Sequence, residues 1–253
     1  MPQPELSHTL DLSIVIPVKD EEESVDTLAG EIEAAMASGT WDWECIWVDD
    51  GSTDDSLSRL KNLARANSRH RYLSFERNAG QSAALWAGFS ASRGAVLATL
   101  DADGQNDPAD LPKLLRLMQE TSADIVNGYR ERRADSLIRK ISSRIGNGFR
   151  NLVTGRTVRD VGCSTRCFRR ECARHLPPFK GMHRFLPTLM ALHGYRFVEI
   201  AVHHRPRDKG HTKYSIHNRL WVGIQDLFGV RWFKNRAFSY SVREQADDHK
   251  ERG

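Results

Sequence analysis

Long apolar segments are absent from this chain of 253 residues. Because no run of about 18 consecutive apolar residues occurs, we expect no membrane-spanning helix. Residues 1–10 also lack the basic-then-apolar order of a signal peptide, which predicts a cytoplasmic location. Cysteine is scarce, with four residues, and in a chain without an export signal we expect these thiols to be reduced.

Two common phosphate-binding motifs are also missing. Neither a Walker-type loop nor a G-x-G-x-x-G sequence follows the first predicted strand, which disfavours a kinase-like or dinucleotide-binding site. Three cysteines and a histidine lie near one another in the sequence, but their spacing matches no compact zinc knuckle. We therefore expect no zinc site at Cys163, Cys167, Cys172 and His175, and we expect the three thiols to be buried or incidental.

Charge is distributed unevenly along the chain, although the net charge is only +4. Residues 1–128 contain 22 acidic and 10 basic side chains, whereas residues 129–219 contain 21 basic and 6 acidic ones. An acidic first half suits a bound cation, and a basic second half suits phosphate, anionic lipid or nucleic acid. Apolar residues make up 40% of the sequence, which is typical of a folded enzyme rather than a disordered chain.

Short apolar segments alternate with helical patterns at intervals of about 25–30 residues, the arrangement expected of a parallel sheet. The segments predicted to be strands are 12–17, 44–48, 72–75, 95–100 and 125–129, with further strands at 163–168 and 197–202. This spacing predicts an α/β fold in a single domain. We expect a Rossmann-like, mostly parallel sheet with helices on both faces.

Polar clusters follow the predicted strands, where ligands bind in parallel sheets. After the fourth strand, Asp101 and Asp103 point to one face if the strand continues, since its side-chain period is two. Close carboxylates repel unless a cation lies between them. Gln105 and Asp107 add oxygen donors, so the cluster predicts a Mg²⁺ or Mn²⁺ site. The alternative is a solvated turn with helix-capping Asp residues.

The cluster Asp49-Asp50-Gly51-Ser52, after the second strand, has two interpretations. One of its carboxylates can accept an N–H from a nucleobase edge, or the cluster can form a turn and helix cap. The basic half offers arginines suited to bidentate phosphate contacts, although a solvated basic face is the alternative for each one. The candidates for a second phosphate site are Arg130, Arg139, Arg144, Arg207 and Lys213.

Residues 216–233 combine apolar and aromatic residues with polar interruptions. They predict a helix that either packs on the core or lies on a membrane surface. Residues 237–253 are polar, and we expect them to fray.

Seven stretches together resemble the family 2 glycosyltransferases of the polyprenyl-phosphate branch, which includes dolichol-phosphate mannosyltransferases and undecaprenyl-phosphate formamido-arabinose transferases. They span residues 13 to about 215 and are specific in their order and joint presence. In chain order they are SIVIPVKDEEES, VDDGSTDDS, ERNAGQSAALWAGF, ATLDADGQNDP, DSLIRKISSRIGN, RDVGCSTRCFRRE and VHHRPRDKGHTKYS. Three departures stand out: this chain lacks the two C-terminal membrane helices of many relatives, and it has Thr212 and Gly104 where serine and a larger residue are common.

The resemblance implies a GT-A fold and assigns functions to particular residues. It implies a nucleotide pocket at Pro17, Val18, Glu21, Asp50 and Asp101, and a metal and diphosphate set of Asp101, Asp103 and Gln105. It implies phosphate contacts at Arg130, Arg144, Arg207 and Lys213. We expect residues 1–10 to be flexible, 11–128 to bind the nucleotide sugar, 129–215 to bind the acceptor, 216–236 to form the amphipathic helix and 237–253 to form the tail.

The expected activity is inverting transfer of a sugar from a UDP- or GDP-linked donor to a polyprenyl phosphate such as undecaprenyl phosphate, with Mg²⁺ or Mn²⁺. Asp103 is a catalytic candidate, and Asp160 is the candidate if a base acts; otherwise Asp160 orients Arg166 or Arg159. We expect a peripheral protein on the inner face of the cell membrane that binds no nucleic acid. The sequence is also compatible with a homo-oligomer. The alternatives are transfer to a lipid A precursor or a glycan hydroxyl, and a non-enzymatic anion-binding module.

Overall fold

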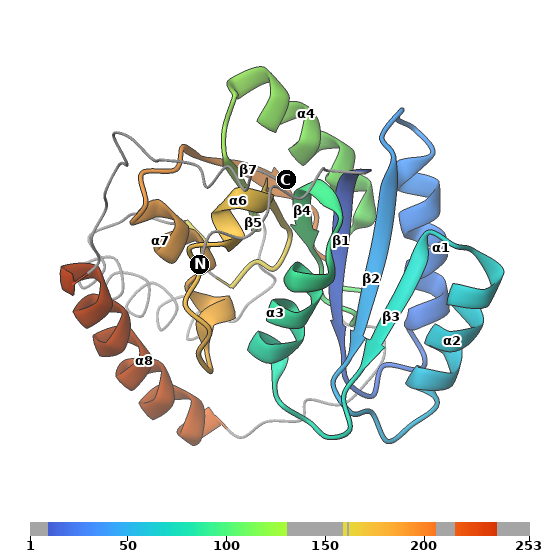
Figure 1. Ribbon diagram of the computed structural model, residues 1–253, viewed down its shortest axis with the longest axis horizontal. Helices are drawn as coiled ribbons and strands as arrows, with labels where there is room; N and C mark the ends of the chain where they lie inside the picture. The colour runs from blue at the N-terminus through green and yellow to red at the C-terminus, as the bar shows by residue number, and fades with distance from the viewer. Residues whose placement is uncertain (1–9, 131–158, 161, 206–215, 237–253) are drawn as a thin grey trace, which may run out of the picture.

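One seven-stranded sheet organises the part of the chain that the computed structural model describes, which comprises residues 10–130, 159–160, 162–205 and 216–236 (Figure 1). Its strand order is β3-β2-β1-β4-β6-β5-β7. The strands are β1 (Leu10–Val18), β2 (Trp43–Asp49), β3 (His70–Ser74), β4 (Gly94–Thr99), β5 (Ile125–Arg130), β6 (Arg166–Arg169) and β7 (Phe197–Val202).

The sheet is parallel except at one strand. β1 pairs in parallel with β2 and β4, β2 with β3, and β5 with β7. β6 lies between β4 and β5 and is antiparallel to both. The prediction of a mostly parallel sheet is confirmed, and β6 joins the basic half of the chain to the middle of the sheet.

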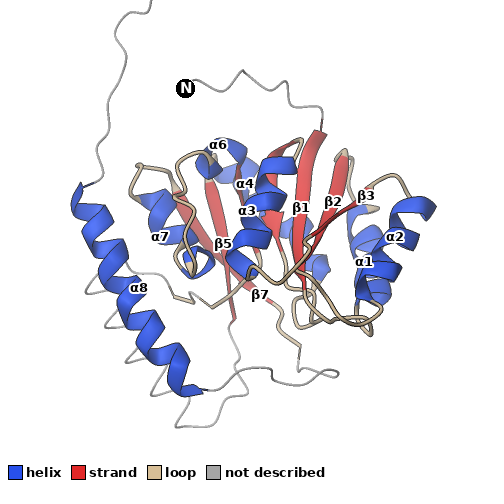
Figure 2. Ribbon diagram, turned by 60° about the horizontal axis from the view of Figure 1, so that its bottom comes forward, coloured by secondary structure: helices blue, strands red, loops and turns tan. Residues whose placement is uncertain are grey.

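Helices cover both faces of the sheet, as predicted (Figure 2). The core on one face includes side chains of α1 (Val25–Met36), α2 (Ser56–Ala66) and α4 (Leu111–Thr121), the last preceded by η1 (Pro108–Asp110). The core on the other face includes α3 (Gln81–Ala91), α6 (Arg170–Ala173), η2 (Met182–Arg184), α7 (Leu186–Ala191) and part of α8 (Ile216–Arg236). Among the helices of the described residues, none has both the length and the apolar character that a membrane crossing requires.

Burial follows the sequence pattern closely in the first half. In β1, residues 12–16 are buried, as a continuous apolar run predicts for a strand covered on both faces. In α1 the buried residues recur three or four positions apart, which places one stripe of the helix against the sheet; they are Val25, Leu28, Ala29, Ile32 and Met36. The carboxyl ends of β1, β2 and β4 are thereby fixed side by side.

Candidate active site

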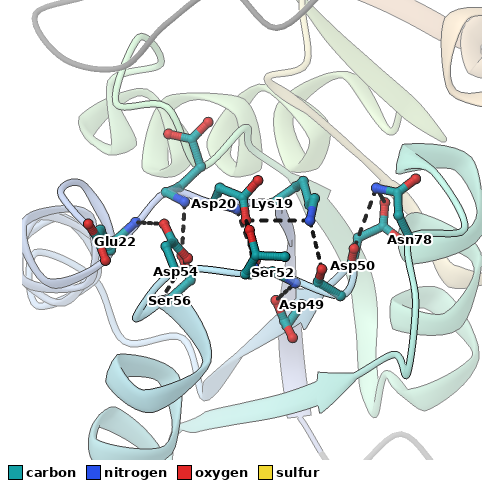
Figure 3. Close-up of polar contacts among 12 residues, drawn as sticks. Lys19, Asp20, Glu22, Asp49, Asp50, Ser52, Asp54, Ser56 and Asn78 are labelled. Carbon is teal, nitrogen blue, oxygen red and sulfur yellow. Dashed lines mark hydrogen bonds and ion pairs between the residues drawn. The ribbon is translucent and has the colours of Figure 1, made fainter.

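The loops that follow β1 and β2 are joined by polar contacts (Figure 3). Lys19 Nζ donates to the Gly51 carbonyl at 2.7 Å, and the Asp20 N–H donates to Ser52 Oγ at 2.9 Å. The Asp20 carboxylate in turn accepts from the Thr53 N–H at 2.7 Å. Asp20 has a φ of 52°, a backbone conformation uncommon outside glycine, which these contacts stabilise.

Three predicted nucleotide-binding residues lie at the end of β1. Pro17 is partly buried, and the Val18 side chain is fully buried in the core. Because this side chain is inaccessible, a ligand that contacts Val18 must do so through its backbone. The Val18 carbonyl already accepts from the Asp50 N–H at 2.8 Å. The Glu21 N–H donates to Ser56 Oγ at 2.8 Å, which holds this loop against the start of α2. Their nucleotide role stays a prediction.

The Asp50 carboxylate holds the loop before α3. It accepts from the backbone N–H groups of Ala79 at 2.6 Å and Gly80 at 2.9 Å, and from Asn78 Nδ2 at 3.0 Å. Asp50 is only 3% exposed. These contacts join Asp50 to a loop distant in the sequence rather than capping the helix that follows it, and its nucleobase role stays a prediction.

Asp101 and Asp103 lie in a turn rather than in a continued strand. β4 ends at Thr99, and Gly104, with a φ of 71°, helps the chain to reverse. The strand does not continue through these residues, so the two-residue strand period does not apply and the turn determines where the side chains lie. Asp101 Oδ1 accepts from Gln81 Nε2 at 3.0 Å, and Asp103 Oδ1 accepts from the Gln105 N–H at 3.2 Å.

The electrostatic environment of Asp101 includes both burial and nearby charges. Burial raises the pKa of the Asp101 carboxyl above its ordinary value, and the charge of Asp103 raises it further. A hydrogen bond from Ser164 and the positive charges of Arg166 and Arg130 act in the opposite direction. Asp101 is therefore an acidic group whose ionisation depends on nearby positive charge.

The segment after Asp103 is fastened to the end of β7. The Arg205 N–H donates to the Gln105 carbonyl at 2.8 Å, and Gln105 Nε2 contacts the Arg205 carbonyl at 3.5 Å. The Arg205 guanidinium binds Glu31 of α1 at 2.7 Å and Asp107 at 3.0 Å. These contacts connect the loop that carries Asp103 and Gln105 to the basic half of the chain.

Asp160 pairs with Arg130, not with Arg166 or Arg159 as expected. The Arg130 guanidinium donates to both Asp160 oxygens, from Nε at 2.6 Å and from Nη2 at 2.9 Å. Asp160 is 4% exposed, so its carboxylate is both buried and held. Arg159 instead contacts Glu199, through its backbone N–H at 3.0 Å.

A pocket of about 330 Å³ lies beside Asp101. It is formed by the start of α3, the loop before β6, β6 itself, η2 and the start of α7. The lining residues are Gln81, Leu85, Thr99, Leu100, Asp101, Gly162, Cys163, Ser164, Arg166, His183, Arg184 and Leu186. Sequence reasoning did not assign a site role to Gln81, Ser164, His183 or Arg184, and considered Arg166 only as a partner of Asp160. The signal available was the RDVGCSTRCFRRE stretch, which contains Ser164 and Arg166.

The structure does not test every predicted residue. Arg139, Arg144, Arg207 and Lys213 lie outside the described residues. Within the described ranges, no group of three or more His, Cys, Asp or Glu side chains gathers as a metal cluster. Asp101 and Asp103 therefore provide two acidic groups, to which the predicted set adds the amide of Gln105.

The sequence matches the family described as Glycosyl transferase family 2 over residues 13–176. Dodecaprenyl-phosphate galacturonate synthase of Rhizobium johnstonii is 38% identical over 229 residues, covering 89% of this chain and 68% of that protein. Undecaprenyl-phosphate 4-deoxy-4-formamido-L-arabinose transferase of Yersinia pestis is 38% identical over 206 residues, covering 81% of this chain and 63% of that protein. The chain thus spans about two thirds of the length of these relatives.

A solved structure of glucosyl-3-phosphoglycerate synthase from Mycobacterium tuberculosis has a TM-score of 0.65 and 19% identity, over 91% of this chain and 82% of that chain. At this identity the likeness concerns the fold alone. Another crystal structure of that enzyme contains Mn²⁺, UDP and glucosyl-3-phosphoglycerate.

The mixed sheet with polar loops at its carboxyl ends is the GT-A architecture of glycosyltransferases. The chain belongs to glycosyl transferase family 2, and its relatives include polyprenyl-phosphate sugar transferases. The predicted resemblance is thereby confirmed.

Proposed function

We propose that this enzyme transfers a sugar from a UDP- or GDP-linked donor to a polyprenyl phosphate, with inversion at the anomeric carbon. Two relatives at 38% identity are named for polyprenyl-phosphate acceptors, which supports this acceptor class. The basic character of residues 129–219 also suits a substrate pair that brings two phosphorylated groups together.

The observation that carries the proposal is the charge of the pocket beside Asp101. Arg166, His183 and Arg184 line it, and Asp101 is the one carboxylate among its described lining residues. A hydroxyl acceptor requires a general base, whereas a phosphate monoester is mostly ionised at pH 7, since its second pKa is about 6. The two arginines of the pocket fit an acceptor that is already an anion.

The predicted metal set fits a divalent cation chemically. Burial and the charge of Asp103 raise the pKa of Asp101, and a positive charge beside the two carboxylates would offset both effects. The Gln105 amide oxygen is a further hard ligand. We propose that these residues hold Mg²⁺ or Mn²⁺, with a diphosphate and water as the remaining ligands. Such an ion, when bound, stabilises the negative charge that grows on a departing nucleoside diphosphate.

The residues of the chain then have distinct tasks in the reaction. The joined loops after β1 and β2 hold the nucleotide, and Asp50 fixes the start of α3, whose Gln81 orients Asp101. Arg130, held by Asp160, lies at the end of β5 near Asp101 and attracts phosphate. An acceptor phosphate oxygen attacks the anomeric carbon while the bond to the nucleoside diphosphate breaks on the opposite side.

The direct test is a transfer assay. The protein is incubated with several UDP- and GDP-sugars, Mn²⁺ and undecaprenyl phosphate, and a glycolipid product is sought by mass spectrometry. Undecaprenol and a glycan acceptor serve as hydroxyl controls. A product that forms with undecaprenyl phosphate but not with the hydroxyl controls supports the proposal. A product that forms only with a hydroxyl acceptor contradicts it.

Asp160→Asn distinguishes a positioning role from general-base catalysis. We expect about a 10-fold loss, mainly as a higher KM for the lipid phosphate, because the amide weakens the charge-assisted pair with Arg130. The measurement is kcat and KM for both substrates from pH 6 to 9. A fall in kcat of about 10³-fold with unchanged KM is the range for a lost general base and would contradict a phosphate acceptor.

We also propose that α8 brings the enzyme to a membrane surface. Leu227 and Val230 of α8 are buried against the core, whereas Phe228 and Trp232 are 56% and 63% exposed. The two exposed side chains are four positions apart and so lie on one stripe of the helix, with the exposed Arg231 beside them. Aromatic and basic side chains on one surface suit the headgroup region of an anionic bilayer.

Phe228→Ser with Trp232→Ser is expected to weaken binding to vesicles of phosphatidylglycerol and phosphatidylcholine by about 10- to 100-fold, through lost apolar burial. Co-sedimentation measures the effect. Gln225→Ser with Asn235→Ser, at exposed polar positions of the same helix, is the control and should bind like wild type. Equal binding by the aromatic variant and wild type would contradict the membrane role of α8.

A further inference from the structure

Arg166 is a buried arginine whose guanidinium is only partly hydrogen-bonded. The residue is 3% exposed and begins β6. Its Nη2 donates to the Cys163 carbonyl, whereas Nε and Nη1 are buried and have no hydrogen-bond partner within the described part of the chain. A buried charged group without hydrogen bonds is strongly destabilising, so these two donors call for a partner.

Nearby acidic groups do not fill this role. Asp101 and Asp160 both interact electrostatically with Arg166, but neither accepts a hydrogen bond from it. The Asp160 oxygens accept from Arg130 and from the Gly162 N–H at 3.2 Å, and Asp101 Oδ1 accepts from Gln81. The charges of the two carboxylates stabilise the positive charge of the Arg166 guanidinium, but neither carboxylate accepts a hydrogen bond from its N–H groups.

Arg166 is one of the residues that line the pocket beside Asp101. Along the sheet, β4 separates β6 from β1, β2 and β3, whose ends carry the proposed nucleotide loops. Asp101 follows β4, and Thr99 of β4 pairs with Arg166, so Arg166 lies on the side of β4 that faces away from β1. The pocket is also lined by His183, whose Nδ1 is 2.8 Å from Ser82 Oγ, and by Arg184.

The geometry points to Arg166 as a substrate-binding residue whose unpartnered guanidinium N–H groups bind an oxyanion of the substrate in this pocket. The inference rests on the proposed function. Nε–H and Nη1–H point to different sides of the guanidinium, and a charge-assisted hydrogen bond from either one suits a carboxylate or phosphate oxygen. The oxyanion has two sources in a reaction of this class: a carboxylate on the transferred sugar, as in a uronic acid, or the phosphate of the lipid acceptor.

The test compares Arg166→Met and Arg166→Lys with Arg169→Met. Arg169 lies on the same strand, but its side chain is exposed and paired with Asp124 at 3.2 Å, outside the pocket. Calorimetry in Mn²⁺ measures the affinity of each variant for UDP, UDP-glucose and UDP-glucuronate, and for farnesyl phosphate in the presence of UDP. Thermal melting of each variant reports the fold, and Arg166→Lys, which keeps the charge, carries the test if Arg166→Met does not fold.

Loss of a charge-assisted pair predicts that both Arg166 variants weaken one oxyanion probe by about 10- to 100-fold, while UDP affinity changes less than about threefold. A loss confined to UDP-glucuronate identifies a sugar carboxylate, and a loss confined to farnesyl phosphate identifies the acceptor phosphate. Arg169→Met should match wild type for every probe. The inference is overturned if no probe weakens, or if UDP and UDP-glucose weaken as much as the oxyanion probes. Wild-type protein that binds neither UDP-sugars nor farnesyl phosphate would contradict the proposed function itself.

Discussion

Asp103→Ala is expected to lower the rate of sugar transfer by at least about 10³-fold while the protein keeps its fold. Asp103 is partly exposed in the turn after β4, where its Oδ1 accepts from the Gln105 N–H at 3.2 Å. Its side chain is not part of the hydrophobic core, so its removal disturbs little packing. It also removes one of the two carboxylates that we propose as metal ligands, so charge on the departing diphosphate loses its stabilisation.

Initial rates at saturating donor, together with circular dichroism and thermal melting, measure this effect. Asp42→Ala is the matched control, because Asp42 is an exposed aspartate just before β2, at the opposite end of the parallel strands. It should transfer sugar at the wild-type rate. Near-normal turnover by Asp103→Ala, or by wild type in EDTA, would remove the metal from the mechanism.

Asp50→Ala is expected to lower the free energy of unfolding by about 3 kcal/mol, since the carboxylate makes several buried charge-assisted hydrogen bonds to residues 78–80. In a protein of this size the melting temperature should fall by roughly 6–12 °C. Urea unfolding and thermal melting measure the change. Asp55→Ala is the control, because Asp55 is exposed and its side chain makes no capping hydrogen bond to α2.

The same position separates the two interpretations of Asp50. If the carboxylate mainly holds the loop before α3, Asp50→Asn should lose stability and transfer together. If it binds the nucleobase, the KM for the donor should rise by about 10-fold while the melting temperature stays near wild type. The second result would confirm the nucleotide role that the resemblance implies.

The first half of the fold is predictable because burial dominates it. β1, β2 and β4 are short apolar strands covered on both faces. Polar residues follow each of them, and this pattern indicates a ligand site at the carboxyl ends of the strands. β6 could be placed as a strand but not oriented. A four-residue strand has too few side chains for its direction or its neighbours to be recognised in the sequence.

The chemistry of the site was harder to predict from the sequence, for a different reason. Asp101 and Asp103 lie in a turn that follows the end of β4, and the partner of Asp160 depends on the end of β5. Whether an arginine is paired is a three-dimensional property, so the unsatisfied donors of Arg166 leave no trace in the sequence. Loop geometry and hydrogen bonding therefore determine the arrangement of the site residues, and the residue pattern predicts neither.

The late position of β6 has a consequence for how the chain is made. β4 and β5 are complete by residue 130, yet the strand that bridges them is residues 166–169. During synthesis on the ribosome, both strands therefore wait with unpaired backbone edges until about 36 further residues have emerged. The nascent enzyme should need protection by chaperones most during this interval, and a chain interrupted within it should aggregate.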